Sequence, residues 1–447
     1  MGPEHLTKGK EIVRKQAMKI YRFPSQTEWD EICSRPHIDT ETLRETVGNI
    51  LKDVKLRGDT AVKEYEQKFD RATLDHLQVS ADEIEVAAAM VSPELKAAIE
   101  MAHDNIACFH NAQLFSSKDI QTQPGVVCWQ KSVAIESVGL YIPGGTAPLF
   151  STVLMLATPA RIAGCSQIVL CTPPSPDGKV NPAILYAAKV AGVSHIYKIG
   201  GVQAIGAMAY GTPTVPKVSK IFGPGNQYVM QAKQQVAMGD VAIDMPAGPS
   251  EVCVIADKSA RADFVAADLL SQAEHGADSQ VVFITTDEAL IAKVQKEIDA
   301  QLALLPRRSI AQAALDNSRI ILVGNTDEAM NLSNYYAPEH LIIQTEDCPE
   351  LAKKVRNAGS VFLGSYAPES AGDYASGTNH TLPTHGHAKA YSGVNLDSFC
   401  RKITFQHLTQ QGAAIIGPAV IEMAAAEQLT AHRNAMLLRL GKDISAK

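Results

Sequence analysis

The stretch Gln167-Ile-Val-Leu-Cys171 is a short apolar run that lies between two segments with helical spacing, residues 151–163 and 181–191. The same alternation continues to residue 236 and begins again at residue 251. Short apolar strands that alternate with helices of roughly ten residues predict parallel βαβ units. We therefore predict an α/β fold with two parallel, Rossmann-like domains.

Neither predicted domain carries a complete dinucleotide-binding fingerprint. The nearest match is Phe222-Gly-Pro-Gly-Asn-Gln-Tyr228, which follows a predicted strand but has Tyr228 in place of the third glycine of G-x-G-x-x-G. Asp244 lies at a distance suited to a ribose contact, although an Asp there is common by chance. The turn could hold a phosphate at a helix N-terminus, or it could be a simple tight turn.

A stretch rich in proline and glycine, Met245-Pro-Ala-Gly-Pro-Ser250, separates the two alternating blocks and predicts a domain boundary. We expect the helices before residue 140 to join the second block, so that the first block is inserted in that domain. The C-terminal residues, with a short predicted strand at 391–399 and two helices, are too few to bury a core alone. We predict an N-terminal arm (residues 1–38) and a main α/β domain in two pieces (residues 39–140 and 249–394). An inserted α/β domain (residues 141–248) lies between these pieces, and a C-terminal segment (residues 395–447) follows.

Composition limits the class of protein. The chain has 447 residues, 46% hydrophobic and 20% charged, which is typical of a soluble protein with more than one domain. Its net charge of −7, with acids and bases interspersed, argues against a nucleic acid partner. The eight cysteines include no Cys-x-x-Cys pair and are expected to be reduced thiols. The first ten residues lack an apolar run, and no segment approaches the roughly 20 apolar residues of a membrane span, so we expect a cytoplasmic protein.

The stretch Tyr335-Tyr-Ala-Pro-Glu-His-Leu341 places an acid and an imidazole side by side after a proline. Proline ends the preceding helix and favours an extended backbone at Ala337. Neighbouring side chains of an extended backbone point to opposite sides, so Glu339 and His340 are predicted to act on different faces of one site. An adjacent Glu-His pair is also common on solvated surfaces, and this stretch alone does not decide between the two.

Two other stretches carry side chains of the kind that bind metals. Gln272 and His275 are three residues apart in a predicted helix and share one face in its last turn, although a single His there usually interacts with the helix dipole. A Gly- and Pro-containing segment further along the chain holds one Asp and three His: Asp373, His380, His385 and His387. The His385-x-His387 pair has ligand-like spacing, but in such a loop a solvated pair is the more ordinary interpretation.

The C-terminal segment holds one more acid and imidazole, Glu427 and His432, five residues apart. Five residues turn a helix by about 140°, so the two would not face one metal unless the helix breaks between them. The residues alone therefore predict a cytosolic α/β enzyme with carboxylates and imidazoles drawn from separated stretches. They do not identify the substrate.

Taken together, the motifs closely resemble the histidinol dehydrogenase family along essentially the whole chain. The motifs that carry this resemblance are Val138-Gly-Leu-Tyr-Ile-Pro-Gly-Gly145, Ile221-Phe-Gly-Pro-Gly-Asn226, Asp244-Met-Pro-Ala-Gly-Pro-Ser-Glu251, Asp268-Leu-Leu-Ser-Gln-Ala-Glu-His275, Asn334-Tyr-Tyr-Ala-Pro-Glu-His-Leu341, Gly372-Asp-Tyr-Ala-Ser-Gly-Thr-Asn-His380, and Glu427 with His432. So many long motifs in the family's order make the resemblance far more specific than any one of them.

The resemblance implies a zinc-dependent, four-electron oxidation of L-histidinol to L-histidine through L-histidinaldehyde, with two NAD⁺. It implies one Zn²⁺ per subunit, held by Gln272, His275, Asp373 and His432. It makes His340 the general base and Glu339 the residue that activates water. The implied substrate contacts are Ser250, Gln272, His275, His340, Asp373, His380, Glu427 and His432. The implied NAD contacts, all in or bordering the inserted domain, are Tyr141, Gln203 and Asn226.

The resemblance also implies a homodimer whose C-terminal segments intertwine, so that Glu427 and His432 reach the partner's site. On this basis His385 and His387 are not ligands. Three alternatives remain open. A cysteine, Cys128 or Cys165, could trap the aldehyde; the protein could be a zinc-dependent hydrolase of a small amino compound; or it could be a binding module without activity. Formation of NADH from histidinol separates the dehydrogenase from the hydrolase.

Overall fold

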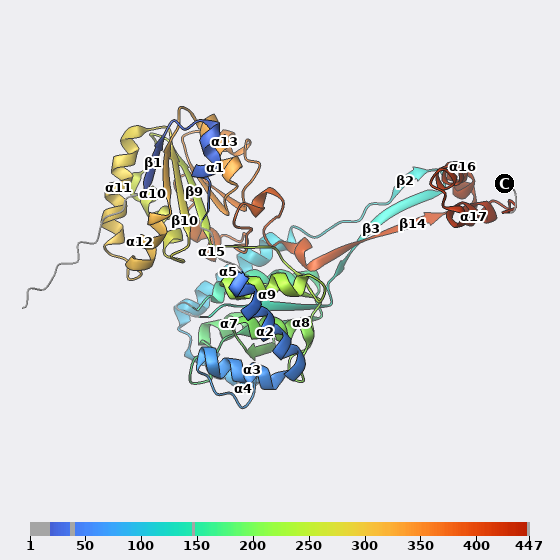
Figure 1. Cartoon of the computed structure of the whole chain (residues 1–447), viewed down its shortest axis with the longest axis horizontal. Coiled ribbons are helices and arrows are strands. Elements are labelled where there is room, and N and C mark those ends of the chain that lie inside the picture. The colour runs from blue at the N-terminus through green and yellow to red at the C-terminus, as the bar shows by residue number, and fades with distance from the viewer. Residues whose placement is uncertain (1–17, 36–40, 145–147, 445–447) are drawn as a thin grey trace, which may run out of the picture.

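The computed structural model describes residues 18–35, 41–144 and 148–444, and it contains two parallel β-sheets covered by helices and one antiparallel sheet (Figure 1). The two parallel sheets confirm the predicted α/β class. They also account for the apolar runs, because strands of a parallel sheet are buried on both faces. Residues 1–17 and 36–38 of the predicted N-terminal arm lie outside the described residues.

The larger sheet has six parallel strands, with β9 near its centre. In order across the sheet, the strands are β1 (Lys19–Arg22), β11 (Arg319–Leu322), β10 (Gln280–Thr285), β9 (Glu251–Ala256), β12 (His340–Gln344) and β13 (Ser360–Leu363). The associated helices are α1 (Trp29–Ile32), α10 (Ala262–Ala273), α11 (Glu288–Leu302), α12 (Arg308–Asp316), α13 (Thr326–Tyr336), α14 (Cys348–Ala352) and α15 (Glu369–Tyr374). Every residue of β9 is buried, and the two faces of the sheet pack into separate apolar clusters.

The smaller sheet has five parallel strands in the order β6-β5-β4-β7-β8. Its strands are β4 (Ser137–Tyr141), β5 (Gln167–Thr172), β6 (His195–Lys198), β7 (Lys220–Phe222) and β8 (Ala242–Ile243). The helices between them are α6 (Phe150–Ala163), α7 (Pro182–Val190), α8 (Gly201–Tyr210) and α9 (Gln227–Ala237). The chain leaves β4 towards β5 and β6 and then returns to β7 on its other side. Such a reversal leaves a crevice at the carboxyl ends of β4 and β7, where ligands bind in open α/β sheets.

The early helices cover this smaller sheet. They are α2 (Glu41–Arg57), α3 (Asp59–Tyr65), the π-helical turn η2 (Glu66–Asp70), α4 (Ala81–Met90) and α5 (Pro93–Asn111). Helices α4 and α5 pack with α6 and α7 on one face, and α2 and α3 pack with α8 and α9 on the other. The expectation that these helices join residues 249–394 is therefore wrong. Helical periodicity shows which face of a helix is buried, but it does not show which sheet that face covers.

The antiparallel sheet forms an arm that projects from the two α/β bodies (Figure 1). Its strands are β14 (Cys400–Leu408), β3 (Val126–Ala134) and β2 (Ile120–Gln123), and the helices α16 (Gln410–Ala426) and α17 (Thr430–Arg439) lie at its tip. The strand expected at residues 391–399 is wrong, because a 3-10 turn, η4 (Leu396–Phe399), capped by Asn395, precedes β14. Within the described ranges, no helix combines the length and the apolar character needed to cross a membrane.

Candidate functional site

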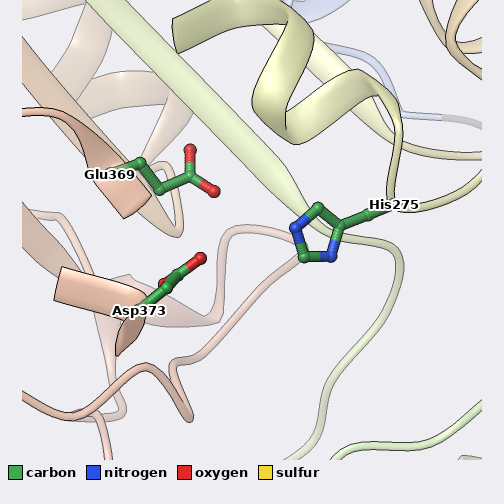
Figure 2. Close-up of side chains that lie close together, drawn as sticks. All are labelled: His275, Glu369 and Asp373. Carbon is green, nitrogen blue, oxygen red and sulfur yellow. The ribbon is translucent and has the colours of Figure 1, made fainter. Parts of the chain in front are cut away.

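Three side chains converge beside the larger sheet. One donor atom each from His275, Glu369 and Asp373 lies within 4.8 Å of the other two, and Figure 2 shows the three side chains pointing towards a common space. Glu369 and Asp373 are four residues apart on α15 and therefore share one face of that helix. His275 follows α10, which ends at Ala273, so it lies just beyond the helix whose last turn it was predicted to share with Gln272. Glu369 was not among the predicted site residues, although its spacing of four residues from Asp373 places both on one face of a helix.

Gln272 is buried beside the same cluster, in the last turn of α10. In the amide orientation that satisfies both groups, its nitrogen donates to the Glu369 carboxylate, 3.1 Å from Oε2 and closer to Oε1. The amide oxygen then faces away from Glu369 and remains available as a neutral ligand. A carboxylate that orients a ligating side chain in this way is typical of the surroundings of metal sites.

The Glu339-His340 pair lies next to this cluster. The imidazole Nε2 of His340 is 3.7 Å from Asp373 Oδ1, and its Nδ1 is 3.8 Å from Glu369 Oε1. His340 Nδ1 donates to the backbone carbonyl of Glu251 at 3.2 Å, which places the proton of the neutral ring on Nδ1. Nε2 is buried and has no hydrogen-bond partner among the described residues. It is therefore the free nitrogen that faces the cluster.

Two expectations for this stretch are wrong. Ala337 is left-handed, with φ 56° and ψ 67°, rather than extended. The side chains of Glu339 and His340 do not separate to different faces, because Glu339 Oε2 lies 3.7 Å from His340 Nδ1. Only His340 belongs to β12, and the turn at Ala337 and Pro338 brings Glu339 alongside it. Glu339 is held there by the backbone N–H of Glu251, which donates to its Oε2 at 2.9 Å.

The cluster holds more negative charge than its imidazoles balance. Burial raises the pKa of Glu339 to about 7 and that of Glu369 to about 8. Burial alone would lower the pKa of His340, but the carboxylates of Glu369 and Glu339, together with Asp373, raise it well above its usual value. Burial would raise the pKa of Asp373, yet contact with His340 lowers it. Carboxylates with raised pKa values that crowd around one imidazole indicate a place for further positive charge.

His380 connects the cluster to the smaller sheet. Its Nδ1 lies 2.9 Å from the backbone oxygen of Asp373, and its Nε2 lies 3.2 Å from the hydroxyl of Thr152 in α6. Ser250 immediately precedes β9, where its carbonyl accepts a hydrogen bond from the backbone N–H of Gln280 at 3.2 Å. Both predicted substrate-contacting residues thus lie on elements that border the cluster.

The structure of one chain does not bring Glu427 and His432 to the other site residues. Glu427 caps the C-terminus of α16 and His432 lies in α17, both at the tip of the arm (Figure 1). The helix does break between them, at Gln428, whose φ is 60°. His385 and His387, whose ring centroids are 6.3 Å apart, are not members of the metal-like group, and the backbone N–H of His385 donates to Glu251 Oε1 at 2.9 Å.

Tyr141, Gln203 and Asn226 line one cavity of about 510 Å³ at the carboxyl ends of the smaller sheet's strands. The other lining residues are Thr46, Ile50, Phe69, Asp70, Gly144, Pro173, Gly201, Val202 and Tyr228. Asn226 caps α9, because its side-chain oxygen accepts from the backbone N–H groups of Tyr228 and Val229 at 3.0 and 3.1 Å. The incomplete glycine turn therefore forms part of a cavity, and the N-terminus of its helix is capped from within the chain.

Gln203 is fully buried at the floor of this cavity. Its amide nitrogen donates to Glu66 Oε1 at 2.7 Å, and its own oxygen has no partner among the described residues. Glu66 Oε1 also accepts from the backbone N–H of Gly200 at 2.9 Å. Burial raises the pKa of Glu66 to about 8. A buried acceptor without a partner, at the wall of a cavity, is available to a ligand.

The cysteines do not take part in either site. All eight are free thiols. Cys128 lies in β3 of the arm, and burial raises the pKa of the Cys165 thiol to about 12. A thiol with so high a pKa is a poor nucleophile at neutral pH.

The two parallel sheets, the buried acid-imidazole cluster and the cavity at the switch point define the class of the protein as an α/β protein with the features of an enzyme active site. The sequence model of histidinol dehydrogenase matches residues 33–440. The chain is 63% identical over 423 residues to histidinol dehydrogenase of Bacteroides thetaiotaomicron, covering 95% of this chain and 99% of that one. It is 52% identical over 413 residues to the Escherichia coli K12 enzyme, covering 92% and 94%.

The same similarity is found in three dimensions. The crystal structure of histidinol dehydrogenase from Elizabethkingia anophelis superposes with a TM-score of 0.93 at 54% sequence identity, covering 95% of this chain and 98% of that chain. The chain belongs to the histidinol dehydrogenase family. The resemblance seen in the sequence motifs is confirmed.

Proposed function

We propose that the protein oxidises L-histidinol to L-histidine through L-histidinaldehyde, in two steps that use two NAD⁺ and one Zn²⁺ per subunit. The observation that carries the proposal is the convergence of His275, Glu369 and Asp373, whose donor atoms lie within 4.8 Å of one another. The free Nε2 of His340 lies 3.7 Å from Asp373. Once a cation balances the carboxylates that raise the pKa of His340, this nitrogen can accept a proton beside the group of metal ligands.

The donor set fits a zinc ion. Imidazole nitrogen and carboxylate oxygen are ordinary zinc ligands, and the excess of buried carboxylate would be balanced by a divalent cation. We assign Gln272, His275 and Asp373 of one chain and His432 of the partner subunit as the ligands, with Glu369 orienting Gln272. When bound, the ion supplies a Lewis acid that holds and orients the amino alcohol.

The first oxidation uses His340 as the base. Its Nε2 takes the proton of the substrate hydroxyl, while its Nδ1–H stays on the Glu251 carbonyl. The carbinol carbon loses a hydride, and NAD⁺, when bound, would supply the hydride acceptor for each of the two oxidations. The neighbouring carboxylate of Glu339, 3.7 Å from the ring, stabilises the imidazolium that forms.

The second oxidation requires water. Glu339 takes a proton from a water molecule as its oxygen adds to the aldehyde carbon, and the imidazolium of His340 returns its proton to the aldehyde oxygen, which gives a diol and frees Nε2 again. His340 then takes a hydroxyl proton from the diol as the second hydride leaves, and the carboxylic acid results. A carboxyl whose pKa is about 7 is well matched to accepting and returning a proton near neutral pH.

We assign NAD⁺ to the cavity at the switch point, in contact with Tyr141, Gln203 and Asn226. The partnerless oxygen of Gln203 supports a polar ligand there. Tyr141 of β4 lines the cavity, and β4 contacts α6. The hydroxyl of Thr152 in α6 lies 3.2 Å from His380 Nε2. A dinucleotide bound at the carboxyl ends of the smaller sheet's strands could therefore extend along α6 towards the acid-imidazole cluster.

We also infer a homodimer with shared sites. The arm exposes large apolar side chains that a single chain leaves uncovered: Ile120, Ile403, Phe405, Ile415, Met423, Leu429 and Leu438. Many large exposed apolar side chains on one projecting part of a chain are typical of subunit interfaces. An intertwined partner would cover it and would bring Glu427 and His432 of the partner subunit to the cluster. The free cysteines support a reducing, cytoplasmic location.

A single assay tests this function. The metal is removed with a chelator and restored with Zn²⁺, and NADH is counted per histidine formed from histidinol. We expect activity to disappear and return, with two NADH per histidine. One NADH per turnover, or product formation without NAD⁺, would contradict the proposal, and turnover of an amino compound without NAD⁺ would favour the hydrolase.

A further inference from the structure

Arg35 lies in the N-terminal segment and reaches the wall of the candidate active site. Its Nη2 donates to Glu251 Oε2 at 2.9 Å and to the backbone carbonyl of Tyr336 at 2.8 Å, and its Nε donates to the other Glu251 oxygen. The guanidinium also stacks on the Tyr336 ring, 4.2 Å from the centroid. The two charged side chains are 12% and 3% exposed, so this is a buried ion pair.

The backbone of Glu251 holds both members of the Glu339-His340 pair. Its N–H donates to Glu339 Oε2 at 2.9 Å, and its carbonyl accepts from His340 Nδ1 at 3.2 Å. The first contact orients the carboxylate, and the second selects the ring tautomer that leaves Nε2 free. Any shift of Glu251 would therefore move both groups together.

The turn that leads to this pair is strained. Ala337 is fully buried and adopts φ 56°, a left-handed conformation that is unfavourable for an L-residue. Such strain persists only where the surroundings hold it. The preceding residue, Tyr336, is held at its carbonyl and ring face by Arg35 and at its hydroxyl, which donates to Gln280 Oε1 at 2.8 Å.

We propose that Arg35 is a positioning residue for Glu339 and His340. It ties the carbonyl before the strained turn to the carboxylate of Glu251, whose backbone contacts the pair, and thereby fixes the turn relative to β9. The inference rests on the roles of Glu339 and His340 in the proposed function. A lysine cannot replace Arg35 in this role, because only a planar guanidinium can pair with both carboxylate oxygens, reach the carbonyl and stack on the ring.

The test compares Arg35→Lys and Arg35→Ala with Arg22→Ala. Arg22 also belongs to the N-terminal segment, but its ion pair with Glu288 is exposed. Alcohol and aldehyde oxidation are measured separately, with kcat referred to folded protein quantified by circular dichroism. We expect both Arg35 variants to lose kcat on the order of 10- to 100-fold in both oxidations, with KM for NAD⁺ changed less than about twofold. Arg22→Ala should match the parent in both constants.

A purely structural role is distinguished by adding Ala337→Gly to each Arg35 variant. Glycine relieves the strain at this position, so thermal stability should rise while kcat stays low. Recovery of kcat together with stability would overturn the inference, as would parental kcat in Arg35→Lys, which keeps the charge beside Glu251. The proposed function is tested separately by Glu339→Gln and His340→Gln. If these two variants lose activity and Arg35→Lys does not, only the positioning role fails.

Discussion

The carboxylate of Glu339 lies 3.7 Å from the imidazole Nδ1 of His340, and the backbone of Glu251 contacts both side chains. Two groups so close to each other share one pocket, yet their free atoms differ. His340 presents Nε2 to the cluster, whereas Glu339 presents a carboxyl with a pKa of about 7. Experiments can therefore test whether His340 and Glu339 act in different oxidation steps.

Glu339→Gln should spare alcohol oxidation more than aldehyde oxidation. The glutamine oxygen can still accept from the Glu251 N–H, so the local structure is kept, but the side chain no longer takes a proton from water. We expect NADH formation from histidinaldehyde to fall by roughly 10²–10⁴-fold, the usual contribution of a general base, and the first hydride transfer to change much less. Single-turnover NADH absorbance with each substrate measures the two rates. An equal loss of rate in both oxidations would show that Glu339 does not act by activating water.

Metal affinity should rise with pH between about 6.5 and 8.5. The raised pKa of Glu369, about 8, means that this carboxyl holds a proton at neutral pH and must lose it to balance a cation. Burial lowers the pKa of His275, so its proton has already left in this range. We expect a gain of up to about tenfold per pH unit, measured by competition with a chromogenic chelator at constant ionic strength. Glu369→Gln should reduce the slope, and an unchanged slope would show that another group titrates.

A mixture of Gln272→Ala and His432→Ala subunits should be more active than either variant alone. Gln272 lies beside the cluster, but His432 lies at the tip of the arm, so a shared site takes one residue from each chain. Each hybrid dimer would then hold one intact site, and a fully exchanged equal mixture should reach about a quarter of parental activity. Exchange is verified by pull-down of one tagged subunit. Absence of activity in verified hybrids would argue against sites shared across the dimer.

Asn226→Asp should weaken NAD⁺ binding without unfolding α9. Aspartate caps helices as well as asparagine does, so the bonds to the N–H groups of Tyr228 and Val229 are retained. The carboxylate nevertheless puts a negative charge into a cavity proposed to hold a diphosphate. We expect KM for NAD⁺ to rise about tenfold, equivalent to roughly 1.4 kcal/mol, with KM for histidinol unchanged. Asn226→Ala, which loses the cap, should instead lower the unfolding temperature. An unaltered KM for NAD⁺ in Asn226→Asp would show that NAD⁺ binds outside this cavity.

Glu66→Gln should stabilise the protein increasingly as pH rises. Burial raises the pKa of Glu66 from 4.5 to about 8, so the folded state disfavours its ionised form. The parent therefore loses stability between about pH 4.5 and 8, whereas glutamine does not titrate. At about 1.4 kcal/mol per pKa unit, the difference should reach a few kcal/mol above pH 8. Unfolding midpoints at pH 5, 7 and 9, at fixed protein concentration, measure it; the exposed Glu346→Gln should show no such trend, and a constant difference would contradict the assignment.

Local sequence patterns were sufficient for most of the secondary structure. The apolar run at residues 167–171 forms β5, and the alternation predicted to begin again at residue 251 starts with β9. These strands are short apolar runs bounded by polar or glycine-containing segments, and burial on both faces leaves that pattern in any parallel sheet. The motifs likewise identified the family without any structure, because they depend on residue order rather than on contacts.

Local sequence patterns did not predict the contacts between distant segments. The early helices joined the smaller sheet rather than the larger one, and Ala337 took a left-handed conformation that its proline neighbour disfavours. Glu369 belongs to the cluster because α15 packs against α10, a contact that the local sequence does not reveal. Arg35 became a neighbour of Glu251 only when the N-terminal segment was placed on the larger sheet.

Periodicity, turn residues and motif order thus indicated an α/β dehydrogenase of this family from the sequence alone. Tertiary structure alone decided which sheet each helix covers, how Glu339 turns towards His340, and which buried groups surround them. The physical reason is that local patterns reflect whether a side chain is buried, whereas the identity of its neighbour depends on the packing of the whole chain, which can also impose a backbone conformation that local preference opposes.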